Sequence, residues 1–340
     1  IGVGGSGGKT IRSMRQTLLR RLRAKGWKGE FPEAWQFLEI DTVSTQGGGN
    51  FNAPLLPPNQ FLGLVPQAVD YLGLRKQLTG RLPREEQNVA LGGWLPENTA
   101  VPIQKGAGQY RTLGRAVVAA QLPQLQQALV RSHNRLSAPG VIEDLKEVSR
   151  TLYGKVEGTS PSPMALVISS VAGGSGAGIY LDVVEALKSI SGDFEKRTQV
   201  LLFGPDVFNN IPIGLRDGVP ANAMGAMNET LAGMWAAGPG VGSSYLFNSA
   251  GLNGRGDSGF GPRNTYLIGA SNGQVSFGDQ DSVYRAAGES LATLVSDEAV
   301  QTWMVEYAIV NVFVNSANPI ICNDISMLKG SQNVFQSQPL

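Results

Sequence analysis

The sequence has little of the chemistry on which thiol- and metal-dependent proteins rely. It contains one cysteine, Cys322, and one histidine, His133. A single cysteine excludes an internal disulfide framework, and these two residues cannot form a His/Cys metal cluster. His133 lies in LVRSHNRL, where we expect a helix surface and assign no role. We therefore expect a reduced, cytoplasmic setting and no metal held directly by side chains.

An excess of charge of one sign is also lacking. The chain carries 28 Lys+Arg and 27 Asp+Glu, a net charge of +1, which gives no reason to expect nucleic acid or an anionic membrane as a partner. Basic residues beginning at Arg12 cluster early at helical spacing, which favours a solvated helix face. The most apolar late run, MVEYAIVNVFVN, is short and contains Glu306, so we expect no membrane span.

Glycine, by contrast, is abundant, with 44 residues in a chain of 340. The opening IGVGGSGGKTIRSM partly fits two nucleotide motifs. A P-loop needs glycine five positions before Gly8, where Val3 stands. The dinucleotide pattern G-x-G-x-x-G fits, but its expected acid about 20 residues on is absent, since Glu39 follows Gly7 by more than 30 residues. Only Ile1 precedes the loop, so we expect the chain to begin inside its first strand.

The order of apolar runs predicts an α/β protein. Strand-like and helix-like segments alternate along most of the chain, which is typical of a mostly parallel, Rossmann-like sheet with helices on both faces. AWQFLEIDTV, PMALVISS, QVLLF, SSYLFNSAG and NTYLIGAS are the strand candidates after the first loop. One long helix is expected over 280–315. Four loops, GVGGSGGKT, GAGQ, AGGSGAG and FGPD, fall at strand ends or before helices, where ligands of such sheets bind.

The loop in SSVAGGSGAGIYLDVV resembles the tubulin/FtsZ signature G-G-G-T-G-[ST]-G. Ala172 stands for its first glycine, Ser175 for its threonine and Ala177 for its hydroxyl residue. The opening loop and helix, FLEIDT, GAGQYRTLGR, LFGPDVF and VYRAAGESL resemble the family's other segments in order. Extra residues near 51–105, 125–160 and 249–263 make the chain more similar to bacterial tubulin-like proteins than to cell-division FtsZ. Tight turns of another α/β fold remain the alternative.

The resemblance implies a GTP/GDP site with Mg²⁺. Backbone amides of two glycine loops would hold phosphates, and a third loop would contact the γ-phosphate. Asp41 and Thr42 would lie near a water-coordinated magnesium ion, Asp206 near the ribose. Lys9 either adds charge to phosphate binding or lies on the surface. The residues implied in phosphate contacts are Gly4, Gly5, Ser6, Gly7, Gly106, Ala107, Gly108, Gln109, Ser170, Gly173, Gly174, Ser175, Gly176 and Ala177.

The resemblance is weaker around the base. Asn272 matches an asparagine that binds guanine, with Asn248 as its rival, and Tyr284 matches the aromatic residue that stacks on guanine. Four residues after Tyr284 the family carries Asp or Asn to contact the base edge, whereas this chain has Gly288. This departure weakens the case for guanine over adenine.

The family's hydrolysis chemistry is shared between neighbouring subunits, which implies a head-to-tail filament of this chain with itself. In NSANPIICNDISMLKG, Asp324 is the nearest candidate for the catalytic carboxylate, and a helix cap is its alternative role. The resemblance divides the chain into a GTP-binding domain over 1–279, the central helix over 280–315, and the start of a truncated or divergent second domain over 316–340. A nucleotide-bound scaffold that does not hydrolyse, and a NAD(P)-dependent oxidoreductase, are the alternative functions.

Overall fold

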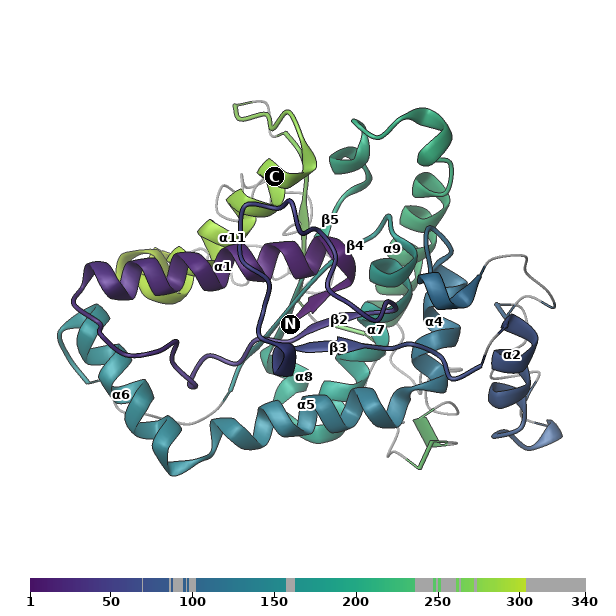
Figure 1. Ribbon diagram of the computed structural model, residues 1–340, viewed down its shortest axis with the longest axis horizontal. Coiled ribbons are helices and arrows are strands. Elements are labelled where there is room, and N and C mark those ends of the chain that lie inside the picture. The colour runs from purple at the N-terminus through teal and green to yellow at the C-terminus, as the bar shows by residue number, and fades with distance from the viewer. Residues whose placement is uncertain are drawn as a thin grey trace.

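The computed structural model describes residues 1–303 except 69, 86, 88–93, 96, 98–101, 157–162, 236–246, 249, 252–260, 263 and 272–273. Its centre is one six-stranded sheet in the order β3-β2-β1-β4-β5-β6, with every pair of neighbours parallel (Figure 1). The predicted α/β class is therefore confirmed. The strands are β1 (Gly2–Val3), β2 (Glu39–Asp41), β3 (Phe61–Gly63), β4 (Ala165–Ser170), β5 (Thr198–Phe203) and β6 (Asn264–Ile268).

Both faces of this sheet are covered, as the near-continuous apolar runs of β4 and β5 require. Successive residues of a strand point to opposite faces, so each strand contributes to two cores. On β5, Val200 and Leu202 belong to one core, and Leu201 and Phe203 belong to the other. The sheet is thus the middle layer of three.

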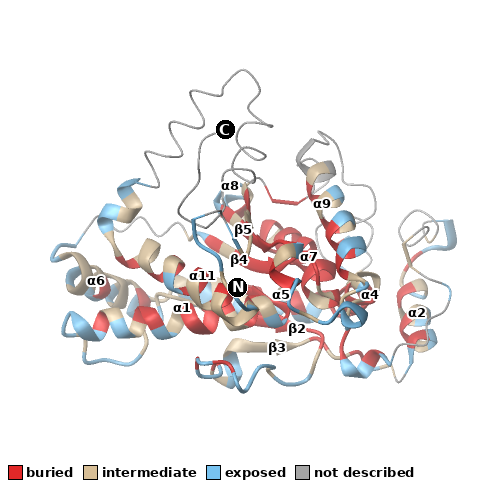
Figure 2. Cartoon of the chain, turned by 90° about the horizontal axis from the view of Figure 1, so that it is seen from above, coloured by how far each residue is buried: buried red, intermediate tan, exposed pale blue. Residues whose placement is uncertain are grey.

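The helices divide between these two faces (Figure 1). Apolar residues of α1 and α11 pack into one core, and those of α4, α5 and α7 pack into the other. α7 is buried along most of its length, as Figure 2 shows, whereas α2 and α6 expose much of their surface. Within the described residues, the helices of eight or more residues are α1 (Gly4–Ala24), α2 (Tyr71–Thr79), α4 (Arg111–Ala120), α5 (Leu122–Leu136), α6 (Pro139–Tyr153), α7 (Gly174–Ile190), α9 (Val219–Trp235) and α11 (Gln280–Ser296).

Two sequence predictions about elements are wrong. Helix α11 ends at Ser296 instead of continuing, because Asp297 adopts an extended conformation with φ −134° and ψ 116°. The Asp297 carboxylate accepts from the amides of Ala299 and Val300, so it starts a new helical segment over 298–303. In the predicted strand SSYLFNSAG, the described residues Phe247 and Asn248 are helical.

The search for membrane-crossing helices covers the described ranges only. Within them, no helix combines the length and the apolar character that a membrane span needs.

Candidate functional site

Two helix N-termini meet at the carboxyl edge of the sheet. Helix α1 follows β1 directly, and α7 follows β4 after a short loop, so the adjacent parallel strands β1 and β4 deliver both helices to one place. This is where the strand order reverses, the usual ligand site of such sheets. A Cβ built on Gly4 would lie 2.8 Å from the amide nitrogen of Gly176. The two glycine loops therefore line one site.

Neither N-terminus is capped by a side chain, although the first amide of α7, on Gly174, donates to the Gly108 carbonyl. Val3 and Gly173 hold the N-cap positions, no side chain accepts a hydrogen bond there, and neither first turn contains an acid. The first amides of a helix have no partner within the helix, and the helix dipole adds positive potential at that end. The site thus presents hydrogen-bond donors and positive potential from two directions, which suits an anion.

The glycines of the two loops serve different purposes. Gly4 has φ +69°, a conformation that side chains rarely adopt. A Cβ on Gly174 would lie 2.6 Å from the carbonyl oxygen of Ala107, and one on Gly7 would lie 2.1 Å from that of Ile168. A Cβ on Gly5 would meet nothing within 4 Å. Gly174 and Gly7 are therefore required by packing within the protein, while Gly5 faces open space.

Thr42 joins three of the loops. Its hydroxyl lies 2.7 Å from the hydroxyl of Ser175 at the start of α7, and it accepts a 2.9 Å hydrogen bond from the amide of Ala107. The amide of Gly174 donates in turn to the carbonyl of Gly108 at 2.8 Å. The loop after β2, the GAGQ loop over 106–109 and the loop that begins α7 are thus brought together.

A second connection comes from Asn222 of α9, a residue that sequence reasoning missed. Its buried side-chain amide donates to the carbonyls of Gln109 and Ala172, at 2.6 and 2.7 Å. Gln109 directs its own side chain to the 215–218 loop, where it accepts from the amide of Gly218 at 3.0 Å. An asparagine inside a predicted helix carries no sequence signal for such a bridge.

Strand β2 carries two carboxylates. Glu39 and Asp41 are both buried, and they point to the same side of the strand. Burial raises the pKa of Glu39 to about 7, with a further increase from Asp41 that Arg12 opposes. Burial likewise raises the pKa of Asp41, and hydrogen bonds from Ser175 and Thr42 work against this rise. One Glu39 oxygen, Oε2, has no hydrogen-bond partner.

Asp206 organises the loop after β5. Its Oδ2 accepts a 2.6 Å hydrogen bond from the amide of Ala270, which follows β6. A Cβ on Gly204 would lie 2.7 Å from the other carboxylate oxygen. Asp206 therefore ties two strand ends together, and a ribose contact stays a prediction.

The predicted base-stacking residue, Tyr284, lies where α11 meets the start of α1. Its ring is 2% exposed and packs edge-on against Phe203, with ring centroids 4.9 Å apart. The Ser6 hydroxyl donates to its phenol oxygen at 3.0 Å, while burial raises the pKa of Tyr284 to about 12. The opening glycine loop and α11 are thus directly hydrogen-bonded.

The Lys9 side chain is paired within the protein rather than free at the surface. Its ammonium forms a 2.7 Å ion pair with Asp281 of α11. The same ammonium lies 5.6 Å from the ring centroids of both Tyr284 and Phe51, within cation–π range. Phe51, buried in a loop after β2, was not expected at the site, because its flanking sequence has no periodic pattern.

Gly288 packs against α1. A Cβ there would lie 2.6 Å from the carbonyl oxygen of Thr10 and 2.8 Å from the Cβ of Ser13. The position that carries a base-contacting residue in the family is therefore filled by helix–helix contact in this protein.

The expected solvated face of α1 is wrong at Arg12. This side chain is 2% exposed, and its guanidinium donates to the carbonyls of Gly47, Gly48 and Ala53 at 2.8 to 3.0 Å. It fixes the loop that carries Phe51, whose ring lies 5.3 Å from the guanidinium. The two terminal nitrogens of the buried guanidinium meet backbone acceptors, while Nε has no hydrogen-bond partner.

Two predicted site residues, Asn272 and Asp324, lie outside the described residues. The remaining candidates lie around the carboxyl edge, including Ser170, whose hydroxyl accepts from the amide of Gly173 at 3.5 Å. Among the described residues, no group of three or more His, Cys, Asp and Glu side chains could hold a metal ion.

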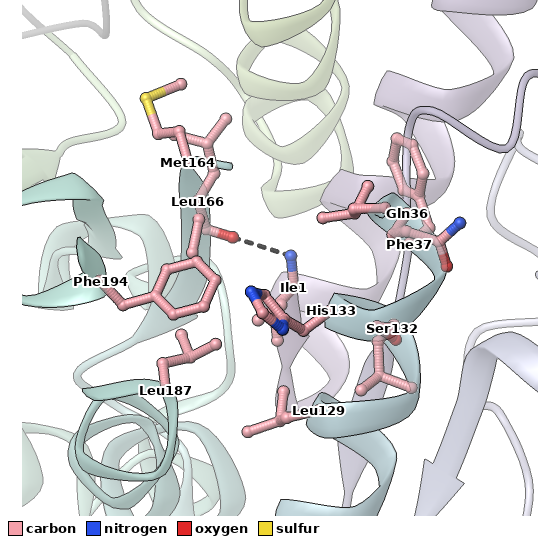
Figure 3. A pocket seen from close by; sticks show the side chains of 13 residues that line it. Ile1, Gln36, Phe37, Leu129, Ser132, His133, Met164, Leu166, Leu187 and Phe194 are labelled. Atoms are coloured by element: carbon pink, nitrogen blue, oxygen red, sulfur yellow. Dashed lines mark hydrogen bonds between the residues drawn. The ribbon is translucent and has the colours of Figure 1, made fainter. Parts of the chain in front are cut away.

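A separate, mainly apolar pocket lies at the opposite end of the sheet (Figure 3). Ile1, which precedes β1, and Leu166, near the start of β4, line it together with His133 of α5 and Phe194. The His133 and Phe194 rings are 5.5 Å apart, edge to face. This pocket is distinct from the site formed by the glycine loops.

Comparison with known families agrees with this geometry. A family model described as "Tubulin like" matches residues 1–326. No curated protein and no solved structure matches the chain significantly.

Proposed function

We propose that this chain, which belongs to the tubulin-like family, binds GTP or GDP with Mg²⁺ and assembles head to tail with copies of itself. The observation that carries the proposal is the meeting of two uncapped helix N-termini, α1 and α7, at the reversal point of a parallel sheet. Their amides converge from opposite sides, as a chain of two or three phosphates requires.

The third loop, GAGQ over 106–109, extends this cradle. Gly108 has φ +54°, and a side chain on it would meet nothing within 4 Å. Its carbonyl is held by the Gly174 amide, so the loop edge lies next to the start of α7. We assign the γ-phosphate to this loop and the α- and β-phosphates to the two helix ends.

Asp41 is the residue suited to magnesium. Mg²⁺ keeps several waters and binds through one or two carboxylates together with substrate phosphates. Asp41 is held at the site by the Thr42 amide, which donates to it at 2.7 Å. Bound magnesium would neutralise phosphate charge next to the two buried carboxylates.

The first test uses Gly5, whose missing side chain leaves open space at the second position of α1. Gly5→Asp places a carboxylate among the free amides, where an acid stabilises a helix and repels phosphate. We expect loss of GTP and GDP binding in calorimetric titration, with unchanged or increased thermal stability of the free protein. Gly5→Asn has the same shape without charge and serves as the matched control.

GTP affinity in Gly5→Asp equal to that of the control would overturn the phosphate assignment. Titration with ATP and NAD, and chromatography of nucleotide released by heat, separate a guanine nucleotide from the alternatives. Preferred binding of NAD would point to the oxidoreductase.

Exposed apolar side chains next to the third loop support self-assembly. Tyr110, Ile213, Leu215 and Met224 are between 56% and 74% exposed. Gln109 binds this region to the loop, because its side chain accepts from Gly218 and donates to the Leu215 carbonyl. A second copy docked there would bury apolar surface and contact the segment next to the γ-phosphate. Such a head-to-tail contact propagates into filaments.

We further propose that hydrolysis, where it occurs, needs a carboxylate of the next subunit, with Asp324 as the candidate. Turnover per subunit should then rise with protein concentration, and Asp324→Ala should lower it without loss of GTP binding. Mixing Asp324→Ala with Gly5→Asp should restore some activity, because one supplies the nucleotide and the other the acid. Turnover per subunit that does not change with protein concentration and is unaffected by Asp324→Ala would contradict this proposal. Absence of any turnover would favour the non-hydrolysing scaffold.

A further inference from the structure

We propose that Asp281, paired with Lys9, contacts the Watson–Crick edge of guanine and takes the role that a side chain at position 288 cannot fill. The inference rests on the proposed nucleotide site. It names the residues that determine base choice, and it places them on the first turn of α11 and the first turns of α1.

The first step is the exclusion of position 288. A Cβ there would lie 2.6 Å from the Thr10 carbonyl oxygen and 2.9 Å from the Met14 amide nitrogen, both backbone atoms of α1. No side chain fits without separating the two helices. Base recognition from α11 must therefore come from a residue nearer its N-terminus.

The second step is the position of Asp281. It lies one helical turn before Tyr284, so both project from one face of α11. Asp281 reaches Lys9, and the Lys9 ammonium lies near the rings of Tyr284 and Phe51. The Lys9 ammonium is thus close to two buried aromatic rings and to the partly exposed Asp281 carboxylate. It lies farther along α1 than Ser6, which belongs to the proposed phosphate cradle.

The third step is chemical complementarity. Guanine places an acceptor, O6, beside two donors, the N1–H and the 2-amino group. A carboxylate accepts from both donors, and an ammonium, with three hydrogens, can donate to O6 while keeping its ion pair. Adenine has an acceptor at N1, which would leave the carboxylate facing an unpaired lone pair. The Asp281 and Lys9 side chains are 44% and 24% exposed, so both are accessible to a ligand.

The test is nucleotide titration of Asp281→Asn. In the unmodified protein we expect GTP to bind more tightly than ITP, which lacks the 2-amino group, and more tightly than ATP. Asp281→Asn should lose about 10- to 100-fold in GTP affinity. It should also reduce the GTP-to-ITP preference and gain affinity for XTP, whose 2-oxo group accepts from the asparagine amide.

Asp279→Asn is the matched control, because it removes the same charge two residues away. Asp279 caps α11 by accepting from the Ser282 amide at 2.8 Å, a role that asparagine can also fill. An unchanged GTP-to-ITP-to-ATP ratio in Asp281→Asn would overturn the assignment of Asp281 while leaving the phosphate site intact. Equal binding of GTP and ATP by the unmodified protein would also overturn it. Failure of the unmodified protein to bind any nucleoside triphosphate would overturn the proposed function as well.

Discussion

Some side chains at the carboxyl edge are buried next to a group of like charge. Glu39 is the clearest case: it is 1% exposed, its Oε2 has no partner, and Asp41 is the nearest carboxylate along the strand. Burial of an unpaired carboxyl favours its neutral form, so the folded protein holds the Glu39 proton more tightly than the unfolded chain does. The local stability of the site therefore depends on pH.

We expect this dependence to disappear in Glu39→Gln. With a pKa near 7 when folded and 4.5 as the ordinary value, Glu39 lowers the free energy of unfolding as pH rises from 4.5 to 7. The neutral amide lacks this loss. Between pH 4 and pH 8 the variant should therefore gain stability relative to the unmodified protein, by at most about 3 kcal/mol. Urea unfolding at both pH values measures it.

The exposed Glu33 supplies the control, since Glu33→Gln should leave the pH dependence unchanged. A Glu39→Gln variant whose stability falls with pH as steeply as that of the unmodified protein would show that folding does not raise the pKa of Glu39.

At the scale of secondary-structure elements, α1 and α11 form one packed pair. Gly288 allows their close approach, and Arg21 of α1 donates to the Thr293 hydroxyl at 2.8 Å farther along. Together with the Ser6–Tyr284 and Lys9–Asp281 contacts, these interactions connect α1 to α11 along most of the length of both helices. A shift of one helix would disturb the other.

This packing predicts that Gly288→Asp, which inserts the family's carboxylate, does not improve guanine recognition. The new side chain must displace the α1 backbone near Thr10 and bury a charge, at a cost of about 2–4 kcal/mol. We expect a lower melting temperature and no increase in GTP preference over ATP. Gly278→Asp, at a position with open space around it, is the matched control. A stable Gly288→Asp protein with stronger GTP preference would contradict the packing argument.

The sequence was sufficient for β4 and β5, because each is a continuous apolar run followed by a glycine loop or a short turn, and the glycine loops could be placed at one edge for the same reason. It did not predict β3, which lies in the 51–105 region where no strand was expected. Other features could not be predicted. Arg12 resembles any solvated arginine until the carbonyls it binds are in place, and Phe51 becomes part of the site only through that contact. The end of α11 at Ser296 depends on the Asp297 side chain binding the amides that follow it.

At the scale of the whole molecule, the exposed apolar residues beside the third loop should decide assembly. Leu215→Glu places a charge on this surface without filling core space, since Leu215 is 65% exposed. We expect the variant to bind GTP normally and to remain monomeric, as measured by light scattering and sedimentation. Leu72→Glu, an exposed leucine on α2, is the control and should assemble normally. Filaments of Leu215→Glu equal to those of the control would exclude this surface from the contact.

The pairing of β1 with β4 also affects the order of events when the chain folds. The Ser169 hydroxyl donates to the Val3 carbonyl across 166 residues of sequence, so the cradle closes only when distant segments have met. Closing so long a loop costs entropy before the contacts compensate for it, which slows folding. A nucleotide bound as proposed would need both helix ends, so its site would form only late on this route. Its binding would slow unfolding without accelerating folding. The lifetime of each folded subunit, rather than the rate at which it forms, would then follow the nucleotide concentration.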